Sequence, residues 1–270
     1  MEISENDLWT LSYYRESELQ GALIMGRLAR EVDDDELRVR LTEHCAEEAQ
    51  HAWLWTQTIL AMGGTPKRVP ETYQSRYYAA IGHPTSLLEI LALTQVFERR
   101  VMRHFRAHLR WPGTHPAVMA TLKKMIEDEV GHVGWVKDWL DAYAAEHGEA
   151  VVVETLRRFD EMDRRVYADL LSQRERMAEL FSRAADGEDE AESLAAQVRR
   201  LAARTLGLPE AKIRSDATLR DVGVNSLDLV LLVMAVEEAF RIEFEPASLE
   251  DVRTFDDLVR RIRELRAVRV

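Results

Sequence analysis

Hydrophobic residues recur every three or four positions from Leu8 to about Phe181, with charged and polar residues between them. This spacing puts the apolar side chains on one stripe of an α-helix. A capping box, Ser86 followed by Glu89 three residues later, marks the beginning of one of these helices. Glycine and proline gather into a few breaks, which divide the region into five predicted helices: residues 5–31, 35–62, 86–110, 117–147 and 149–183.

The breaks also predict how the chain is divided. The segment from Gly63 to Thr85 is long and rich in glycine and proline, so it is expected to cross from one pair of helices to another. Residues 184–190 are acidic and lack large apolar side chains, as in a solvated linker. We therefore predict an all-α protein with a helical bundle over residues 1–183, a linker over 184–190 and a second domain over 191–270.

One acidic motif occurs twice within the predicted bundle. Residues 47–51 (Glu-Glu-Ala-Gln-His) and 128–132 (Asp-Glu-Val-Gly-His) both have an acid, then a glutamate, then a histidine three positions later. Each follows a lone glutamate at a matched distance, 48 − 18 = 30 and 129 − 98 = 31 residues. A single Glu-x-x-His arises by chance about once in such a chain. Two copies with matched spacing indicate one shared site. The apolar residues flanking the motifs put both on buried stripes: Leu41, Trp55, Ile59, Leu122, Met125 and Val136.

Residues three apart share a helix face, so each glutamate and histidine can reach a common point in the core. Four carboxylates would be costly there unless two divalent cations neutralised them. Carboxylate and imidazole donors suit iron or manganese, with zinc as an alternative. The predicted metal ligands are Glu18, Glu48, His51, Glu98, Glu129 and His132.

Some positions around this set stay open. Glu16 is an alternative to Glu18 if the phase of the first helix differs slightly. The acid before each motif, Glu47 or Asp128, could accept a hydrogen bond from the second nitrogen of a ligand histidine. The lone histidines nearby, including His44, are not predicted to be ligands.

Over about residues 5–150 this arrangement resembles the ferritin-like superfamily of di-iron carboxylate proteins, which includes rubrerythrin-like members. The resemblance implies a four-helix bundle, here with an additional long helix, that holds two iron ions or a manganese–iron pair and uses dioxygen as co-substrate. Cys45 is the only cysteine, so a rubredoxin-like iron site is excluded within this chain. Electrons would come from an external donor.

Residues 191–267 resemble an acyl carrier protein. The turn at residues 223–227 (Gly-Val-Asn-Ser-Leu) stands where carriers have Gly-x-Asp-Ser-Leu, with Asn225 in place of the usual aspartate. The resemblance implies a small four-helix domain and 4′-phosphopantetheine attached to Ser226 by a phosphopantetheinyl transferase. A serine that begins a helix suits an incoming phosphate, although Ser226 could also be an ordinary helix N-cap. The acids between Asp228 and Glu245 resemble the face by which carriers meet basic patches on partner enzymes.

The composition of the chain disfavours some classes of binding partner. The net charge of −12 disfavours nucleic-acid binding. No apolar run approaches the length of a membrane span, and the acidic beginning lacks the features of a secretory signal. A cytoplasmic protein without a membrane partner is expected. Its expected partners are the transferase, enzymes that load acyl or aminoacyl groups and an external electron donor, and a homodimer is one option for its assembly.

These features together predict a dioxygen-dependent di-iron oxidase or oxygenase. Its substrate would be an acyl or aminoacyl group held as a thioester on its own or a partner's carrier domain, which it would hydroxylate, desaturate or cleave in a biosynthetic pathway. Covalent joining of the two domains raises the effective concentration of such a substrate. Two alternatives stay open: a ferroxidase or peroxidase localised by the carrier, and a non-catalytic platform stabilised by metal.

Overall fold

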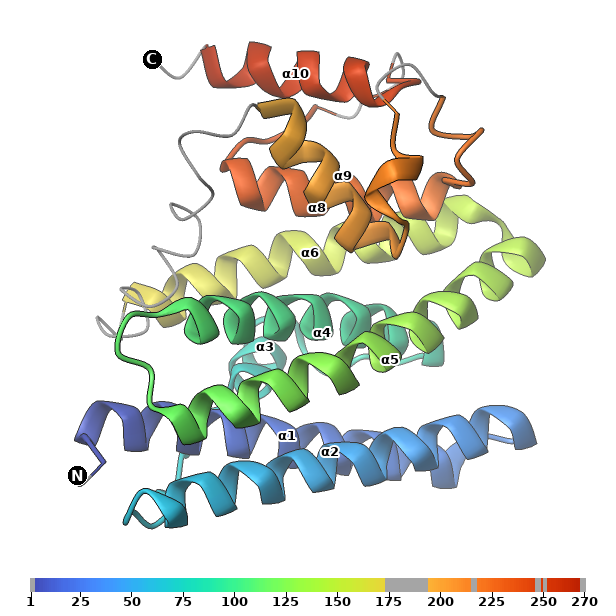
Figure 1. Cartoon of the computed structure of the whole chain (residues 1–270). Helices are drawn as coiled ribbons and strands as arrows, with labels where there is room; N and C mark the ends of the chain where they lie inside the picture. The colour runs from blue at the N-terminus through green and yellow to red at the C-terminus, as the bar shows by residue number, and fades with distance from the viewer. Residues whose placement is uncertain (1–2, 173–193, 215–217, 246–248, 250–251, 268–270) are drawn as a thin grey trace. The chain divides into compact units, whose positions relative to one another are not determined.

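The computed structural model describes residues 3–172, 194–214, 218–245, 249 and 252–267 (Figure 1). Within these ranges the regular elements are helices, apart from one isolated bridge between Thr218 and Thr254, so the all-α prediction is confirmed. The chain forms two compact units. One contains residues 1–139 and resumes at residue 161, whereas residues 140–160 belong with the C-terminal part. The predicted boundaries at residues 183 and 190 lie outside the described residues.

Three of the long helices follow a residue whose side chain caps them. Ser4, Asp34 and Ser86 each accept a hydrogen bond from the backbone N–H three residues later, which satisfies a donor that the helix itself cannot pair. The Glu89 carboxylate accepts from the N–H of Thr85 at 2.7 Å. The helices are α1 (Glu5–Glu31), α2 (Asp35–Ala61), α4 (Leu87–Arg110), α5 (Pro116–His147) and α6 (Glu149–Ser172). These bounds agree with the predicted ones within one residue, except that the last predicted helix runs beyond the described residues.

The crossover between α2 and α4 contains a helix that the sequence pattern did not predict. This helix, α3 (Tyr73–Ile81), is capped by the side chain of Thr72, which accepts from the N–H of Ser75 at 3.1 Å. Its nine residues are fewer than the ten to twelve needed to distinguish a helix by periodicity. The structure therefore replaces the predicted loop with a short helix that packs beside the bundle.

The core of the bundle lies where the motif-flanking residues were expected. The six flanking residues named above are completely buried. Tyr14 of α1 packs its ring against Trp55 of α2 and Phe105 of α4, with ring centroids 5.2 Å away in both pairs. Thr58 of α2 and Thr121 of α5 share a hydrogen bond of 2.6 Å. These contacts bring α1, α2, α4 and α5 around one common interior.

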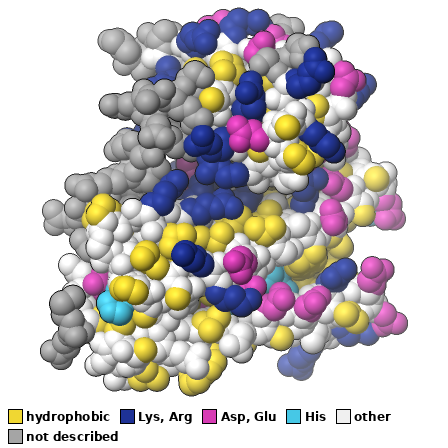
Figure 2. Space-filling view, viewed as in Figure 1, with side chains coloured by type: hydrophobic (Ala, Val, Ile, Leu, Met, Phe, Trp, Pro, Cys, Tyr) yellow, Lys and Arg dark blue, Asp and Glu magenta, His cyan; other side chains and the backbone are white. Residues whose placement is uncertain are grey.

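Acidic residues gather at the turn from α1 into α2, where Asp33, Asp34, Asp35 and Glu36 follow one another. The space-filling view shows acidic side chains at this end of the bundle (Figure 2). Negative charge is favourable there because the N-terminus of α2 carries a partial positive charge.

The C-terminal part has a separate hydrophobic core. Three α-helices and a 3₁₀ turn are described there: α8 (Leu194–Leu206), η1 (Glu210–Lys212), α9 (Ser226–Phe240) and α10 (Phe255–Ala267). Val198, Leu232, Val236, Leu258 and Ile262 lie at its centre and are inaccessible to solvent. Among the helices described in the whole chain, none has both the length and the apolar character needed to cross a membrane.

Candidate metal centre and carrier site

The structure brings the six predicted ligands together in the interior of the bundle. Two overlapping groups have ligand atoms within 4.8 Å of one another: Glu18, Glu48, His51 and Glu129 in one, and His44, Glu48, Glu98 and His132 in the other. Glu18 is buried and belongs to the first group, whereas Glu16 is partly exposed and pairs with Arg15. Glu48 belongs to both groups and is therefore positioned to bridge two ions.

The two motif histidines point the same nitrogen at the shared interior. His51 Nδ1 lies 3.4 Å from Glu129 Oε1 and 3.7 Å from Glu18 Oε2. His132 Nδ1 lies 3.1 Å from Glu129 Oε2 and 3.4 Å from Glu48 Oε1. Both Nδ1 atoms therefore lie among the carboxylate oxygens, where a metal ligand would be needed.

The opposite nitrogen of each histidine contacts the acid that precedes the other motif. His51 Nε2 lies 3.3 Å from Asp128 Oδ2 across the interface with α5, and His132 Nε2 lies 2.8 Å from Glu47 Oε2 on α2. An ionised carboxylate can only accept there, so each Nε2 carries a hydrogen, and each Nδ1 is the nitrogen that can offer its lone pair to a metal once its own proton is lost. The sequence had left open which histidine each acid would orient, and the structure shows that each acts across the helix pair.

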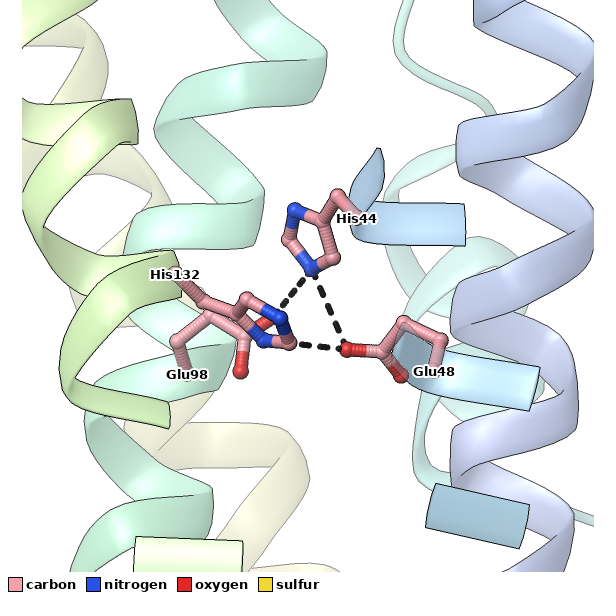
Figure 3. Close-up of side chains that lie close together, drawn as sticks. All are labelled: His44, Glu48, Glu98 and His132. Carbon is pink, nitrogen blue, oxygen red and sulfur yellow. Dashed lines mark hydrogen bonds and ion pairs between the residues drawn. The ribbon is translucent and has the colours of Figure 1, made fainter. Parts of the chain in front are cut away.

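His44 lies in the second group although the sequence did not select it (Figure 3). Its Nε2 is 3.1 Å from Glu48 Oε1 and 3.4 Å from Glu98 Oε1. Its Nδ1 accepts a hydrogen bond from the indole N–H of Trp135 at 3.2 Å. Because an indole only donates, a neutral His44 carries its hydrogen on Nε2 and donates toward the two glutamates. In this tautomer His44 would orient the carboxylates of two predicted ligands, Glu48 and Glu98, rather than offer a lone pair to a metal.

Burial and crowded negative charge perturb the titration of this interior. Burial and the charges of the three neighbouring glutamates raise the pKa of Glu48 well above its ordinary value. Burial opposes protonation of His51 and His132, but the adjacent carboxylates outweigh it and raise their pKa values to about 11 and about 9. Burial lowers the pKa of His44, which agrees with a neutral imidazole. Metal binding would therefore displace protons from the histidines.

Two features of the site fit a pair of divalent ions. His51 Nδ1 and Glu129 Oε1 are both buried and make no hydrogen bond within the described structure, although they face each other. Buried polar atoms of this kind usually have a partner, and a cation between them would provide it. When all four carboxylates are ionised they carry four negative charges, which two divalent cations would balance. The donors, oxygen and imidazole nitrogen without thiolate, suit iron, manganese or zinc.

Gly21 makes room for the shared ligand. A Cβ atom built on this α1 residue would lie 2.4 Å from Glu48 Oε2 and 3.0 Å from Glu48 Cδ, closer than side chains approach. A side chain at this position of α1 would therefore displace the Glu48 carboxylate from the place that it occupies. Sequence spacing gave no indication of this role.

The carrier site lies at the beginning of α9. Gly223, with a φ of +87°, forms the turn before it, and glycine adopts this conformation without strain. Asn225 is the N-cap: its side chain accepts from the N–H of Asp228 at 2.8 Å, and Asp228 accepts from the N–H of Asn225 at 3.1 Å. Ser226 is the first helical residue and is exposed. Since Asn225 provides the cap, the alternative role of Ser226 as an N-cap is excluded.

Two of the acids expected on a docking face are used inside the domain. Asp228 is buried in this capping box, and Glu237 is buried with its carboxylate accepting from the N–H of Phe244 at 2.8 Å. Glu243 and Glu245 are exposed. The acidic surface available to a partner is thus smaller than the sequence count suggested.

Comparison with known protein families identifies the type of domain in the C-terminal part. Residues 196–262 match the family model described as phosphopantetheine attachment site. These residues form an acyl carrier domain. The match includes Ser226, at the position where the carrier resemblance predicts attachment of the arm. No ferritin-like family matches the N-terminal helices, and no solved structure matches the chain. The candidate metal centre therefore depends on its geometry.

Proposed function

We propose that the chain is an oxidase or oxygenase with a dinuclear metal centre, acting on an acyl or aminoacyl group bound as a thioester to phosphopantetheine on a carrier domain. The observation that carries the proposal is a buried set of four carboxylates and two histidines in the same chain as a carrier domain. The carrier would bring its substrate to the bundle at a high effective concentration because both are one polypeptide.

The ligands would be Glu18, Glu48, His51, Glu98, Glu129 and His132, and Glu48 belongs to both groups of donor atoms. Two bound iron ions would supply the redox chemistry that reduces dioxygen. The chain's own side chains would orient the ligands, because Asp128 and Glu47 accept hydrogen bonds from the Nε2 atoms of His51 and His132 and fix their tautomers.

The products follow from the balance of atoms and electrons. Hydroxylation would put one oxygen atom of dioxygen into the acyl group and release the other as water, using two electrons and two protons from an external reductase. Desaturation would remove two hydrogen atoms from the acyl group and, with two further electrons and protons from the donor, give two waters. The donor remains separate because the lone Cys45 cannot hold an iron–sulfur or rubredoxin-like centre.

Intact-mass measurement of the iron-loaded holo-protein, carrying an acyl group on Ser226, tests this proposal. Reduction followed by exposure to air should add about 16 Da for oxygen insertion or remove about 2 Da for desaturation, and cleavage should release a shortened acyl group. Ser226→Ala, which cannot be loaded, is the control. Unchanged acyl mass with no consumption of oxygen, for a range of acyl groups, would refute the oxidase proposal.

The same experiment distinguishes the alternatives. Oxidation of free ferrous iron or turnover of peroxide that is equally fast in Ser226→Ala would identify a ferroxidase or peroxidase. Zinc in the purified protein, with the loaded carrier still used by other enzymes, would identify a metal-stabilised platform.

A further inference from the structure

A cavity opens directly onto the candidate metal centre from the side of α1, α3 and α4. Its empty space, counted together with the solvent at its mouth, is ≈ 540 Å³, and its lining includes the predicted ligands Glu18, Glu48 and Glu98. The remaining wall is mainly apolar, with Ile24 and Met25 from α1 and Ile90, Leu93, Phe97 and Val101 from α4.

A second cavity, with ≈ 480 Å³ of empty space when the solvent at its mouth is included, adjoins the first. The two share Ser17, Glu18, Gln74, Phe97 and Val101 as lining residues, so they meet beside the candidate ligand Glu18. The second cavity continues among the aromatic side chains of Tyr13, Tyr14, Tyr73 and Phe105, and its lining also contains Arg100 and His104. A group lying against the carboxylates could therefore extend along an apolar and aromatic wall.

Gln74, on the crossover helix α3, supplies a polar group to both cavities. Its Nε2 donates to the carbonyl oxygen of Ser17 at 3.2 Å, which fixes the orientation of the amide. Its Oε1 is buried and has no hydrogen-bond partner among the described residues. A buried acceptor without a partner costs free energy that a donating ligand would recover.

We propose that these joined cavities, the α1/α3/α4 cavity, bind the acyl part of the carrier-bound substrate, and that this acyl group is apolar but bears one hydroxyl or amino group that donates to Gln74 Oε1. The inference rests on the proposed function, because the carrier domain defines what would enter. It goes further in naming the substrate class. The apolar wall selects a hydrocarbon or aromatic body, the three glutamates adjoin the atoms to be oxidised, and Gln74 selects a donor.

Binding can be measured without oxidation. The probes are the N-acetylcysteamine thioester of heptanoic acid, a short mimic of the loaded arm, and its isostere in which the terminal methyl is replaced by a hydroxyl. Calorimetry with the full-length protein under anaerobic conditions should show about 10-fold tighter binding of the hydroxyl probe, the size expected for one additional hydrogen bond to a buried acceptor.

Two variants locate the interaction. Gln74→Leu keeps the size of the side chain but removes the acceptor, so the preference for the hydroxyl probe should disappear. Gln57→Leu makes the same change at an exposed position of α2 and should preserve it. Val101→Phe fills the wall common to both cavities and should weaken both probes about 10-fold or more, while the helical content and metal content stay at wild-type values.

The outcomes are separable from those of the proposed function. If both probes fail to bind, or if Gln74→Leu retains the preference, or if Val101→Phe binds both probes as tightly as the wild type, the cavity assignment is wrong even where the loaded protein consumes oxygen. Selective binding that depends on Gln74 would support the assignment even where no oxidation follows.

Discussion

Replacing Gly21 by alanine should separate the stability of the bundle from its ability to bind metal. The added Cβ would lie 2.4 Å from Glu48 Oε2, so the carboxylate would have to move by about 1 Å to reach an ordinary contact distance. The atom that must move is the end of a flexible side chain, so the helices themselves need not shift. Glu48 is the residue shared by both candidate metal positions, and its displacement should therefore affect both.

The two effects have opposite signs. In the metal-free protein, alanine in a helix is favoured over glycine by about 0.5–1 kcal/mol, so Gly21→Ala should unfold at the same temperature or a few degrees higher. Metal affinity should fall by about 10- to 100-fold, the loss seen when the surroundings of a ligand are disturbed. This corresponds to about 1.4–2.8 kcal/mol of binding free energy.

The assay compares metal content per chain, competition with a chromophoric chelator, and thermal unfolding with and without a chelator. Gly134→Ala is the matched control, because it makes the same change in α5 where a Cβ would meet nothing within 4 Å. It should gain the same stability and keep wild-type affinity. Two metals per chain with wild-type affinity in Gly21→Ala would refute the assignment of Glu48 as the shared ligand, and so would an equal loss in Gly134→Ala.

Three further predictions follow from contacts around the site. His44→Phe should keep two metals per chain but bind them about 10- to 100-fold more weakly, because the imidazole that orients Glu48 and Glu98 is lost. One metal per chain would instead show that His44 is a ligand. Glu47→Gln should weaken metal binding by a similar factor in chelator competition, since the charged partner of His132 Nε2 is removed, and unchanged affinity would contradict the orienting role. Burial and two neighbouring arginines hold the pKa of His104 well below 6.5, so the unfolded chain takes up a proton below pH 6.5 that the folded chain does not. This contribution to stability is complete above pH 6.5 and decreases by at most about 1.4 kcal/mol per pH unit as the pH falls through the folded pKa. His104→Phe should remove that part of the acid dependence in urea unfolding, and identical pH profiles for the two proteins would refute it.

The sequence predicted the parts of the site that depend on spacing within one helix. Glu48 and His51 lie three positions apart, which alone fixes them on one face. The apolar residues on either side then show that this face is buried, and the structure agrees at each flanking position. The same reasoning preferred Glu18 over Glu16, and the structure places Glu18 in the cluster.

The contacts that the sequence did not predict depend on how the helices are aligned along one another. His44 meets Trp135 across 91 positions and His132 meets Glu47 across 85. The sliding of one helix along another is set by packing of the whole interface, and no local pattern encodes it. The role of Gly21 has the same origin, since a glycine in a helix has no distinctive periodicity, and only the position of α2 shows what its missing side chain avoids.

The crossover illustrates how a failure of local prediction can coincide with function. Glycines and prolines at both ends of the segment indicated a loop, and the nine residues of α3 were too few to contradict that. A loop would have left the α1–α4 side of the bundle without a fixed wall. A helix capped by Thr72 instead holds Gln74 in one orientation beside Ser17, which is what a selective contact requires, because a donor is distinguished from a methyl group only when its acceptor cannot turn away. The element least visible in the sequence is thus the one on which substrate choice would depend.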